Sequence, residues 1–433
     1  MTGECPNFVF YLSSEWETFH RPHMLRAMAR CAGNGGGRVL LVDRMMCPFS
    51  GALRGFRHPT AGRLRGIKEW GRTLARSLTG RQVEQLDDNL YLCRTMIFLN
   101  DWQAHGIGAT PALNLNRRLL RRQLASILRR VGFDGRPLVT WFHSPLWVHY
   151  VGMLREDLRV YECYDEHAET AGLSRTAAQR IRILEKELLR RVDLAFTTSQ
   201  ALLVAKSLLH RRVYCVPNAA DFSYYSRVQD ASQPVDAELA RLPHPIVGFL
   251  GNIKEDTGLG LLRYVAEQRP NWSVVVAGRV EHRGVLALAD FQRLQKLPNV
   301  RFLGWVDRSR HLSVCKAFDV GIIPYDGDSI YNRYVNPTKL HEYTAMGKPI
   351  VAMEGAEMDS HRDLIFLAKS PEEFLVAIEA AYQSDSPEKI EQRLQFAKSN
   401  SWDARVRTMM NRVMELIQEN AVASVRAGVE LPV

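Results

Sequence analysis

The strongest constraint on the fold is an alternation of short buried strands and helices that occurs twice along the 433-residue chain. In the first half, strand-like apolar runs stand at 8–12, 38–42, 137–142, 159–164, 193–197 and 213–216, and helical periodicity covers 174–191. Parallel strands need helical crossovers, so this alternation predicts a doubly wound α/β domain.

The alternation restarts after a polar linker over residues 218–244. Strands are expected at 246–250, 273–277, 300–303, 320–323 and 349–352, with helices at 259–268 and 337–346. We therefore predict the fold class as α/β, with two Rossmann-like, doubly wound domains that face a central cleft. The expected N-terminal domain is 1–220 and the second domain is 221–401. A C-terminal helix over 402–419 should pack back on the first domain, followed by a tail at 420–433.

The composition is that of a globular protein, with 46% hydrophobic and 24% charged residues, and excludes a disordered or fibrous chain. No apolar run reaches the roughly 18 residues that a membrane span needs, and the first residues lack the basic start of a signal peptide. Seven scattered cysteines without a CxxC pair indicate reduced thiols in a cytoplasmic protein. Neither a disulfide framework nor a zinc site is expected.

The net charge of +10 is concentrated in the first half. Over residues 1–220, 32 Lys and Arg face 19 Asp and Glu, whereas the remainder is slightly acidic. Residues 54–81 combine a helical apolar spacing with eight basic residues and one acid, and six arginines follow within 117–130. These two segments predict peripheral association with an anionic membrane surface, although a core-facing helix with a solvated basic back would have the same pattern. No nucleic-acid-binding signature accompanies the charge, so no nucleic acid partner is expected.

The most informative motif runs from Asn336 to Glu342, where a helix is expected to begin at Asn336-Pro337. Backbone N–H groups and the positive dipole end of a helix N-terminus form an anion site, and Lys339 stands in the first turn. Glu342 lies one turn later, where a carboxylate can accept hydrogen bonds from a ribose diol. The motif predicts a nucleoside diphosphate site; the alternative is an ordinary amphipathic surface helix.

This motif resembles the donor-binding half of GT-B-fold glycosyltransferases of the bacterial polysaccharide-assembly type, which include glucuronosyltransferases. Further similar stretches are Ser14 to Leu25, Val216-Pro217-Asn218 and Gly248 to Asn252, so the resemblance covers most of the chain. It implies that Thr338 and Lys339 contact the diphosphate, that Glu342 contacts the ribose, and that the Trp305-Val306 turn contacts the base. Other donor-binding residues expected on this basis are Gly251, Asn252, Lys254, Arg279, Tyr325, Asn336 and Pro337.

Many retaining GT-B enzymes carry two glutamates eight residues apart, and the first of these positions is Tyr334 in this chain. The departure favours an inverting transfer, which needs a general base and no obligatory metal or cofactor. Asp165 directly follows the fourth strand, in the place where similar enzymes carry a catalytic aspartate. Glu166 and His167 are the next candidates on the acceptor side, together with Arg21 and His23. The alternatives for the Asp165–Glu169 cluster are a solvated loop that caps a helix and a metal site, and Arg21 could simply cap its own loop.

The expected function is transfer of a sugar from a UDP- or GDP-sugar to a saccharide acceptor, expected to be lipid-linked, in cell-envelope or exopolysaccharide synthesis. The protein is expected to be cytoplasmic and attached to the inner face of the membrane. Two alternatives stay open: a nucleotide-sugar epimerase on the same scaffold, and a non-catalytic nucleotide-binding partner of a polysaccharide assembly complex.

Overall fold

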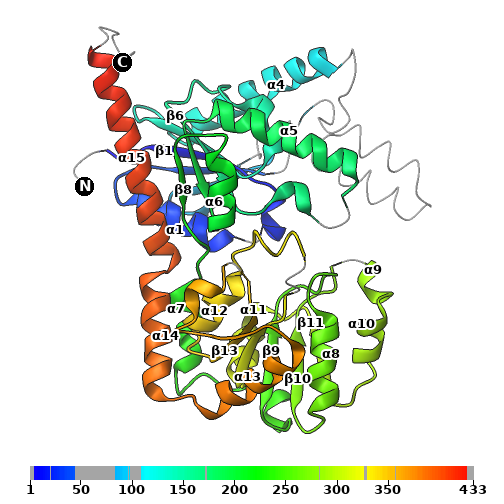
Figure 1. Cartoon of the computed structure of the whole chain (residues 1–433). Coiled ribbons are helices and arrows are strands. Elements are labelled where there is room, and N and C mark those ends of the chain that lie inside the picture. Colours follow the sequence, from blue (N-terminus) through cyan, green and yellow to red (C-terminus); the bar gives the residue numbers. More distant parts are fainter. Residues whose placement is uncertain are drawn as a thin grey trace, which may run out of the picture.

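A computed structural model of the chain describes residues 4–19, 21–43, 83–95, 97, 109–170, 173–281, 283–325, 329–355 and 357–426. It contains two predominantly parallel sheets, one in each half of the chain, and helices cover both faces of each sheet (Figure 1). The predicted fold class is therefore confirmed. The expected basic segment 54–81 lies outside the described residues.

The first sheet has the strand order β3-β4-β2-β1-β5-β6-β7-β8. The strands are β1 (Asn7–Tyr11), β2 (Val39–Val42), β3 (Val83–Asp87), β4 (Leu90–Cys93), β5 (Leu138–Phe142), β6 (Leu158–Cys163), β7 (Leu194–Thr197) and β8 (Val213–Cys215). All neighbours are parallel except β3 and β4, which form an antiparallel edge. The sequence did not predict these two strands, because β3 reads Val-Glu-Gln-Leu-Asp and is largely exposed.

Alternate side chains of these strands enter two separate hydrophobic cores, one on each face of the sheet. Phe8 and Phe10 of β1 belong to the core that includes α1 (Pro22–Gly33). Val9 and Tyr11 belong to the opposite core, beneath α4 (Ala109–Arg130) and α5 (Arg175–Arg191). Burial on both faces explains why the strands are continuous apolar runs.

The second sheet is wholly parallel, with the order β11-β10-β9-β12-β13-β14. Its strands are β9 (Ile246–Leu250), β10 (Ser273–Ala277), β11 (Val300–Gly304), β12 (Val320–Ile323), β13 (Ile350–Met353) and β14 (Phe366–Ala368). The α-helices of this half are α7 (Phe222–Tyr225), α8 (Leu259–Gln268), α9 (Arg283–Leu286), α10 (Ala289–Leu294), α11 (Arg308–Ala317), α12 (Thr338–Ala345), α13 (Pro371–Gln383) and α14 (Pro387–Ser399). Every strand expected here from the sequence is present, and β14 is an addition.

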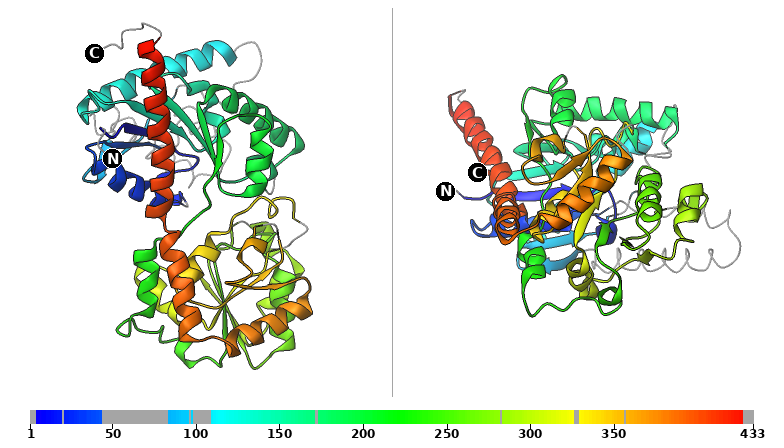
Figure 2. Two further views of the ribbon diagram at one scale, coloured as in Figure 1. Left: turned by 60° about the vertical axis from the view of Figure 1, so that its left-hand side comes forward. Right: turned by 60° about the horizontal axis from the view of Figure 1, so that its bottom comes forward.

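The last helix, α15 (Trp402–Arg426), connects the two halves of the molecule. It leaves the end of α14 beside the second domain and runs along the first domain (Figure 2). Its buried residues Trp402, Val406, Met410 and Val413 join the same core as α1. The C-terminal helix thus completes the N-terminal core, and it is longer than the expected 402–419.

The remaining helical segments are short, apart from α6 (Gln200–Ser207) between β7 and β8. They are the 3-10 turns η1 (Trp16–Thr18), η2 (Pro145–Tyr150), η3 (His167–Glu169), η4 (Ser226–Gln229), η5 (Leu239–Arg241) and η6 (Asp359–His361). None of the helices in the described ranges is both long and apolar enough to cross a membrane.

Candidate active site between the two domains

The carboxyl ends of the two sheets meet at one polar cluster. Asp165 follows β6 of the first sheet, whereas Lys254 follows β9 and Tyr331 follows β12 of the second. Lys254 and Tyr331 stand near enough to Asp165 for both to lower the pKa of its carboxyl group, and the Lys254 ammonium lies 5.7 Å from the centre of the Tyr331 ring. Ligands of open α/β sheets bind at the carboxyl ends of strands, so this cluster marks the candidate site.

Asp165 has the electrostatic character of a general base. Burial raises the pKa of its carboxyl group to about 6, against the opposing effects of the Lys254 charge, the Tyr331 hydroxyl and the Arg21 charge. A carboxylate of this pKa is ionised at neutral pH and is more basic than an ordinary aspartate. The first domain therefore carries a carboxylate with a raised pKa, and cationic and phenolic groups of the second domain stand near it.

The predicted anion site at the start of α12 is built around Lys339. Its ammonium donates a 2.8 Å hydrogen bond to the Tyr325 hydroxyl and lies 5.0 Å from the centre of the Phe249 ring. A Cβ at Gly251 would stand 2.5 Å from the Lys339 Nζ, and Gly251 has a φ of 142°. The positive φ favours glycine there, and a Cβ would also force the end of the Lys339 side chain to move.

Glu342 lies one turn along α12, as the motif predicted. Its Oε1 accepts a 3.0 Å hydrogen bond from the Tyr225 hydroxyl. Burial raises the pKa of Glu342, while Lys339, Tyr225 and His23 act in the opposite direction. The influence of His23, a residue of α1, shows that the first domain comes close to this end of the site.

The expected base-binding turn presents an exposed aromatic surface. Trp305 is 60% exposed, and the Arg279 guanidinium stands 4.2 Å from the centre of its ring. Val306 instead contacts the core of the second domain. The pair of Arg279 and Trp305 thus joins a cation to a flat ring beyond the carboxyl ends of β10 and β11.

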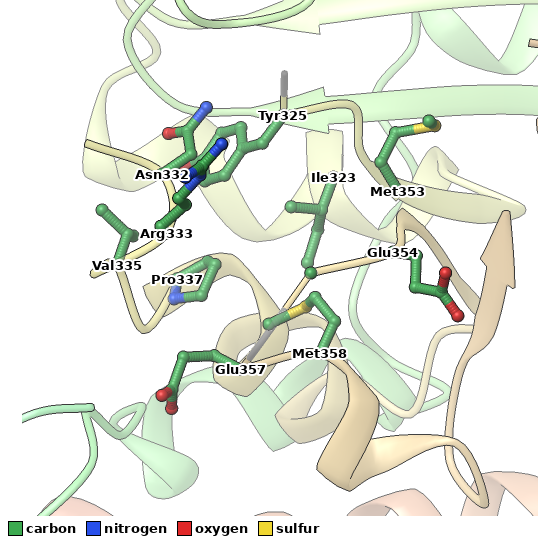
Figure 3. Close-up of a pocket in the computed structure, with 11 residues that line it drawn as sticks. Ile323, Tyr325, Asn332, Arg333, Val335, Pro337, Met353, Glu354, Glu357 and Met358 are labelled. Atoms are coloured by element: carbon green, nitrogen blue, oxygen red, sulfur yellow. The ribbon is translucent and has the colours of Figure 1, made fainter. Parts of the chain in front are cut away.

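A small pocket opens beside the start of α12 (Figure 3). The carboxyl ends of β12 and β13 supply its wall with Ile323 and Met353, and Pro337 closes it toward the helix. Asn332 and Arg333 also line it, and neither was predicted as a site residue. The available signal was their position between a strand end and the helix of the Asn336–Glu342 motif, since loops in that place carry ligand contacts in α/β folds.

The side chain of Asn336, a predicted donor-binding residue, forms hydrogen bonds with other residues of the protein. Its Oδ1 accepts hydrogen bonds from the Asn218 backbone N–H at 3.0 Å and from the His341 Nε2 at 2.8 Å. The Asn218 side chain in turn donates to the Asn336 carbonyl at 2.7 Å. Asn336 therefore ties the exit of the first domain to the segment before α12.

Three further contacts join the domains. The Glu357 carboxylate accepts a 2.7 Å hydrogen bond from the Gln200 N–H, at the N-terminus of α6. His23, an acceptor-side candidate, lies 3.0 Å from the Asp221 carboxylate through its Nδ1. Tyr334, at the position of the missing glutamate, packs against the first domain's core beneath α4 and α5.

Arg21, an acceptor-side candidate, is buried and forms an ion pair inside the first domain. It is 1% exposed, its Nη1 lies 2.6 Å from Glu162 Oε1, and its guanidinium stacks 4.9 Å from the Trp402 ring centre. Glu162 also accepts hydrogen bonds from Trp141 at 2.9 Å and His143 at 3.1 Å. Burial opposes ionisation of Glu162, but Arg21 and His143 prevail and lower its pKa to about 2.

The other two candidates beside Asp165 are also turned inward. The Lys206 ammonium donates hydrogen bonds of 2.7 Å to both Glu166 and Glu185, inside the first domain. Burial lowers the pKa of His167 to about 4, so its imidazole is neutral at pH 7. Asp165, by contrast, stands near Lys254 and Tyr331 of the second domain, and both residues act on its pKa.

Within the described ranges, no group of three or more His, Cys, Asp and Glu side chains is arranged to hold a metal ion.

Comparison with known proteins agrees with this geometry. Residues 244–384, which form most of the second domain, match the family Glycosyl transferases group 1. The solved structure of sucrose-phosphate synthase from Thermosynechococcus elongatus superposes with a TM-score of 0.63, covering 96% of this chain and 100% of that one at 14% identity. Anabaena Alr3699/HepE in complex with UDP gives a TM-score of 0.60 at 14% identity, with 96% and 100% covered. The chain has the GT-B fold.

A sequence relative leads to the same enzyme class. The chain is 26% identical over 294 residues to TuaH of Bacillus subtilis (strain 168), named as a teichuronic acid biosynthesis glycosyltransferase, with 64% of this chain and 72% of TuaH covered. Together with the group 1 domain, this relative supports a glycosyltransferase enzyme, as the sequence motifs predicted.

The roles of Arg21 and Glu162 can be separated from acceptor binding by stability measurements. Glu162→Gln should lower the free energy of unfolding by about 3–5 kcal/mol, because it leaves a buried guanidinium without its counter-charge. The double variant Arg21→Met/Glu162→Gln should recover part of this loss in urea unfolding at pH 7. An Arg21→Met variant of unchanged stability but with a raised acceptor KM would instead assign Arg21 to acceptor binding.

Proposed function

We propose that the chain transfers a sugar from a UDP- or GDP-sugar to a saccharide acceptor with inversion at the anomeric carbon, and that Asp165 is the general base. The observation that carries this proposal is the position of Asp165 near Lys254 and Tyr331 of the second domain, since a basic carboxylate there would face the proposed anion-binding end of that domain. The group 1 match and the solved UDP complex of the GT-B neighbour HepE support the nucleotide-sugar donor.

In the proposed reaction, the acceptor hydroxyl attacks the anomeric carbon while its proton passes to the Asp165 carboxylate. The bond from the anomeric carbon to the nucleoside diphosphate breaks, and the diphosphate leaves with the bonding electron pair. Lys339 and the start of α12 stabilise the negative charge that develops on the leaving group, with Lys254 and Arg279 nearby. Cationic side chains supply this charge, so the proposed mechanism requires no metal and no cofactor.

The roles at the donor follow from the positions of the side chains. Glu342 would accept hydrogen bonds from the ribose diol, held in place by Tyr225. The turn at Trp305 and Val306 would contact the base, and Thr338 and Lys339 the diphosphate. The remaining proposed donor contacts are Gly251, Asn252, Tyr325 and the segment Asn336-Pro337, of which Asn336 would act through its backbone.

We further propose a lipid-linked acceptor and attachment to the cytoplasmic face of the membrane. Helix α4 lies at the end of the first domain remote from the second domain (Figure 1). Its exposed face carries Arg118, Arg121, Arg122 and Arg129, and the helix contains no acidic residue. Anionic headgroups attract such a row of arginines, while the name of TuaH supports an envelope polysaccharide as the product.

Donor binding is testable by calorimetric titration of the full chain with UDP and GDP. One nucleotide should bind, and Lys339→Ala should weaken it about 10- to 100-fold because a charge-assisted hydrogen bond to phosphate is lost. Glu342→Ala should weaken it about tenfold through the ribose. The control Lys369→Ala removes an exposed charge of the same domain and should leave the dissociation constant unchanged. If neither nucleotide binds, the donor assignment fails.

The base is testable by separating turnover from binding. Asp165→Asn should leave the nucleotide dissociation constant unchanged and reduce transfer about 10²- to 10⁴-fold, the typical contribution of a general base. Because Asp165 must be ionised, kcat/KM of the unmodified chain should fall as the pH drops below about 6. Full activity of Asp165→Asn would require another base. Epimerisation of the donor without an acceptor would favour the epimerase alternative.

Membrane attachment is testable by flotation with vesicles that contain 30% anionic lipid. The triple variant Arg118→Gln/Arg121→Gln/Arg122→Gln should bind about 100-fold less tightly, at about 1 kcal/mol for each charge near the surface. The matched control neutralises three exposed charges of the second domain, Arg241, Arg293 and Lys296, and should bind as the unmodified chain does. Equal binding of the two triple variants would rule out α4 as the attachment surface.

A further inference from the structure

The central pairing of the second sheet ends before its strands do. The strand order reverses between β9 and β12, because β10 and β11 lie beyond β9, whereas β13 and β14 lie beyond β12. These two strands, both fully described, pair at Val247 with Val320 and at Gly248 with Gly321. Their pairing stops there, although each strand continues for two more residues toward its carboxyl end. Ligands of open α/β sheets bind where the strand order reverses, so the two strands separate at the place where a ligand is expected.

The hydroxyl of Tyr343, a residue of α12, takes the place of the next bond in the ladder. In a parallel pair of this register, that bond would join the Leu250 N–H to the Ile322 carbonyl. Instead, the Leu250 N–H donates to the Tyr343 hydroxyl at 2.8 Å, and this hydroxyl donates to the Gly248 carbonyl at 3.1 Å. The Ile322 carbonyl lies 3.5 Å from the same hydroxyl oxygen. Tyr343 thus satisfies polar groups at the end of β9 while it keeps β9 and β12 apart.

The ring of Tyr343 is held in this position by its packing against β12. The side chain is fully buried, and a Cβ at Gly321 would stand 2.7 Å from its Cγ. Glycine at this position therefore lets the ring lie directly on the strand. Because a buried N–H without an acceptor is costly, the bond from Leu250 to Tyr343 is expected to persist in the folded protein.

Tyr343 connects the two sides of the proposed diphosphate site. On α12, Lys339 precedes it by four residues, which is about one helical turn. On β9, Leu250 is followed directly by Gly251, where a Cβ would stand 2.5 Å from the Lys339 Nζ. The bond between Tyr343 and Leu250 therefore sets the distance between the loop after β9 and the start of α12.

We propose that Tyr343 is a positioning residue of the donor site, whose hydroxyl holds the end of β9 and the start of α12 at the separation that the two phosphates of the donor need. This inference rests on the proposed function. Because Tyr343 is buried, it acts through the proposed diphosphate contacts Gly251, Asn252 and Lys339. Without the hydroxyl, the Leu250 N–H and the Ile322 carbonyl could pair directly, and β9 would move toward β12.

The test compares Tyr343→Phe with the control Tyr161→Phe by calorimetric titration of the full chain with UDP, GDP, UMP and GMP. Tyr161 is also fully buried, and its hydroxyl donates a 2.7 Å hydrogen bond to Glu185 inside the first domain. Tyr343→Phe should raise the dissociation constant of the diphosphate about three- to tenfold and that of the monophosphate by less than about twofold, because one hydrogen bond that positions the diphosphate site is lost. Tyr161→Phe should leave both constants unchanged. A purely structural role of Tyr343 would lower the midpoint of urea unfolding without changing the preference for diphosphate over monophosphate.

A second variant, Gly321→Ala, disturbs the same position without removing the hydroxyl. The added methyl group must displace the Tyr343 ring, so this variant should also lose part of the preference for diphosphate. It decides the inference if Tyr343→Phe does not fold.

Two outcomes would overturn the inference and leave the glycosyltransferase proposal intact. The first is an unchanged preference for diphosphate in folded Tyr343→Phe or, where that variant does not fold, in Gly321→Ala. The second is an equal loss of this preference in Tyr161→Phe, which would indicate a general effect of lost stability. If the unmodified chain binds neither UDP nor GDP, the proposed function fails, and this inference fails with it.

Discussion

The buried ion pair between Arg21 and Glu162 is the interaction on which the rest of the site depends. It joins the start of α1 to β6, and the Arg21 guanidinium stacks on Trp402 at the start of α15. Two buried charges cost several kcal/mol of desolvation each, which only their pairing and hydrogen bonds can offset. Trp141 and His143 supply those bonds to Glu162, so sheet, first helix and last helix are held in one arrangement. Asp165 leaves β6 three residues after Glu162, and its position follows from this pair.

In that arrangement the charged groups near Asp165 have two different kinds of partner. The charged groups near Asp165 fall into two sets: those that neutralise one another inside the first domain, such as Glu166 with Lys206, and those that face the second domain. Asp165 belongs to the second set and keeps a pKa of about 6, because burial outweighs its cationic and phenolic neighbours. On the opposite side, Lys339 stands beside Gly251, where the absence of a side chain leaves room for the ammonium. The result is a basic carboxylate on one domain and a cationic helix start on the other, which the proposed transfer of a sugar from a nucleoside diphosphate to an acceptor would use.

Much of the fold follows from local patterns in the sequence. The strands of the second domain are uniform apolar runs. Helix α8 was expected over the range it occupies, because the helical spacing of its apolar residues matches the face that is buried. The edge strand β3 was missed, since a mostly exposed strand has no apolar signal. Sequence reasoning also placed Lys339 and Glu342 at the start of a helix and Asp165 at the end of a strand, where the structure has them, because strand ends and helix starts have recognisable signals; their roles are proposals. It did not find Tyr331, Tyr225 or the inward orientation of Arg21, because these depend on which segments meet in three dimensions, and no spacing along the chain encodes that.

The central claim is that Asp165 deprotonates an acceptor which attacks the sugar from the face opposite the nucleotide. The most direct test is the anomeric configuration of the product, read by ¹H NMR from the coupling constant of the anomeric proton after transfer from an α-linked sugar nucleotide. The account predicts a β-linked product, formed by the unmodified chain and lost in Asp165→Asn. An α-linked product would contradict it, because retention requires a different arrangement of the reacting groups from the one built around Asp165.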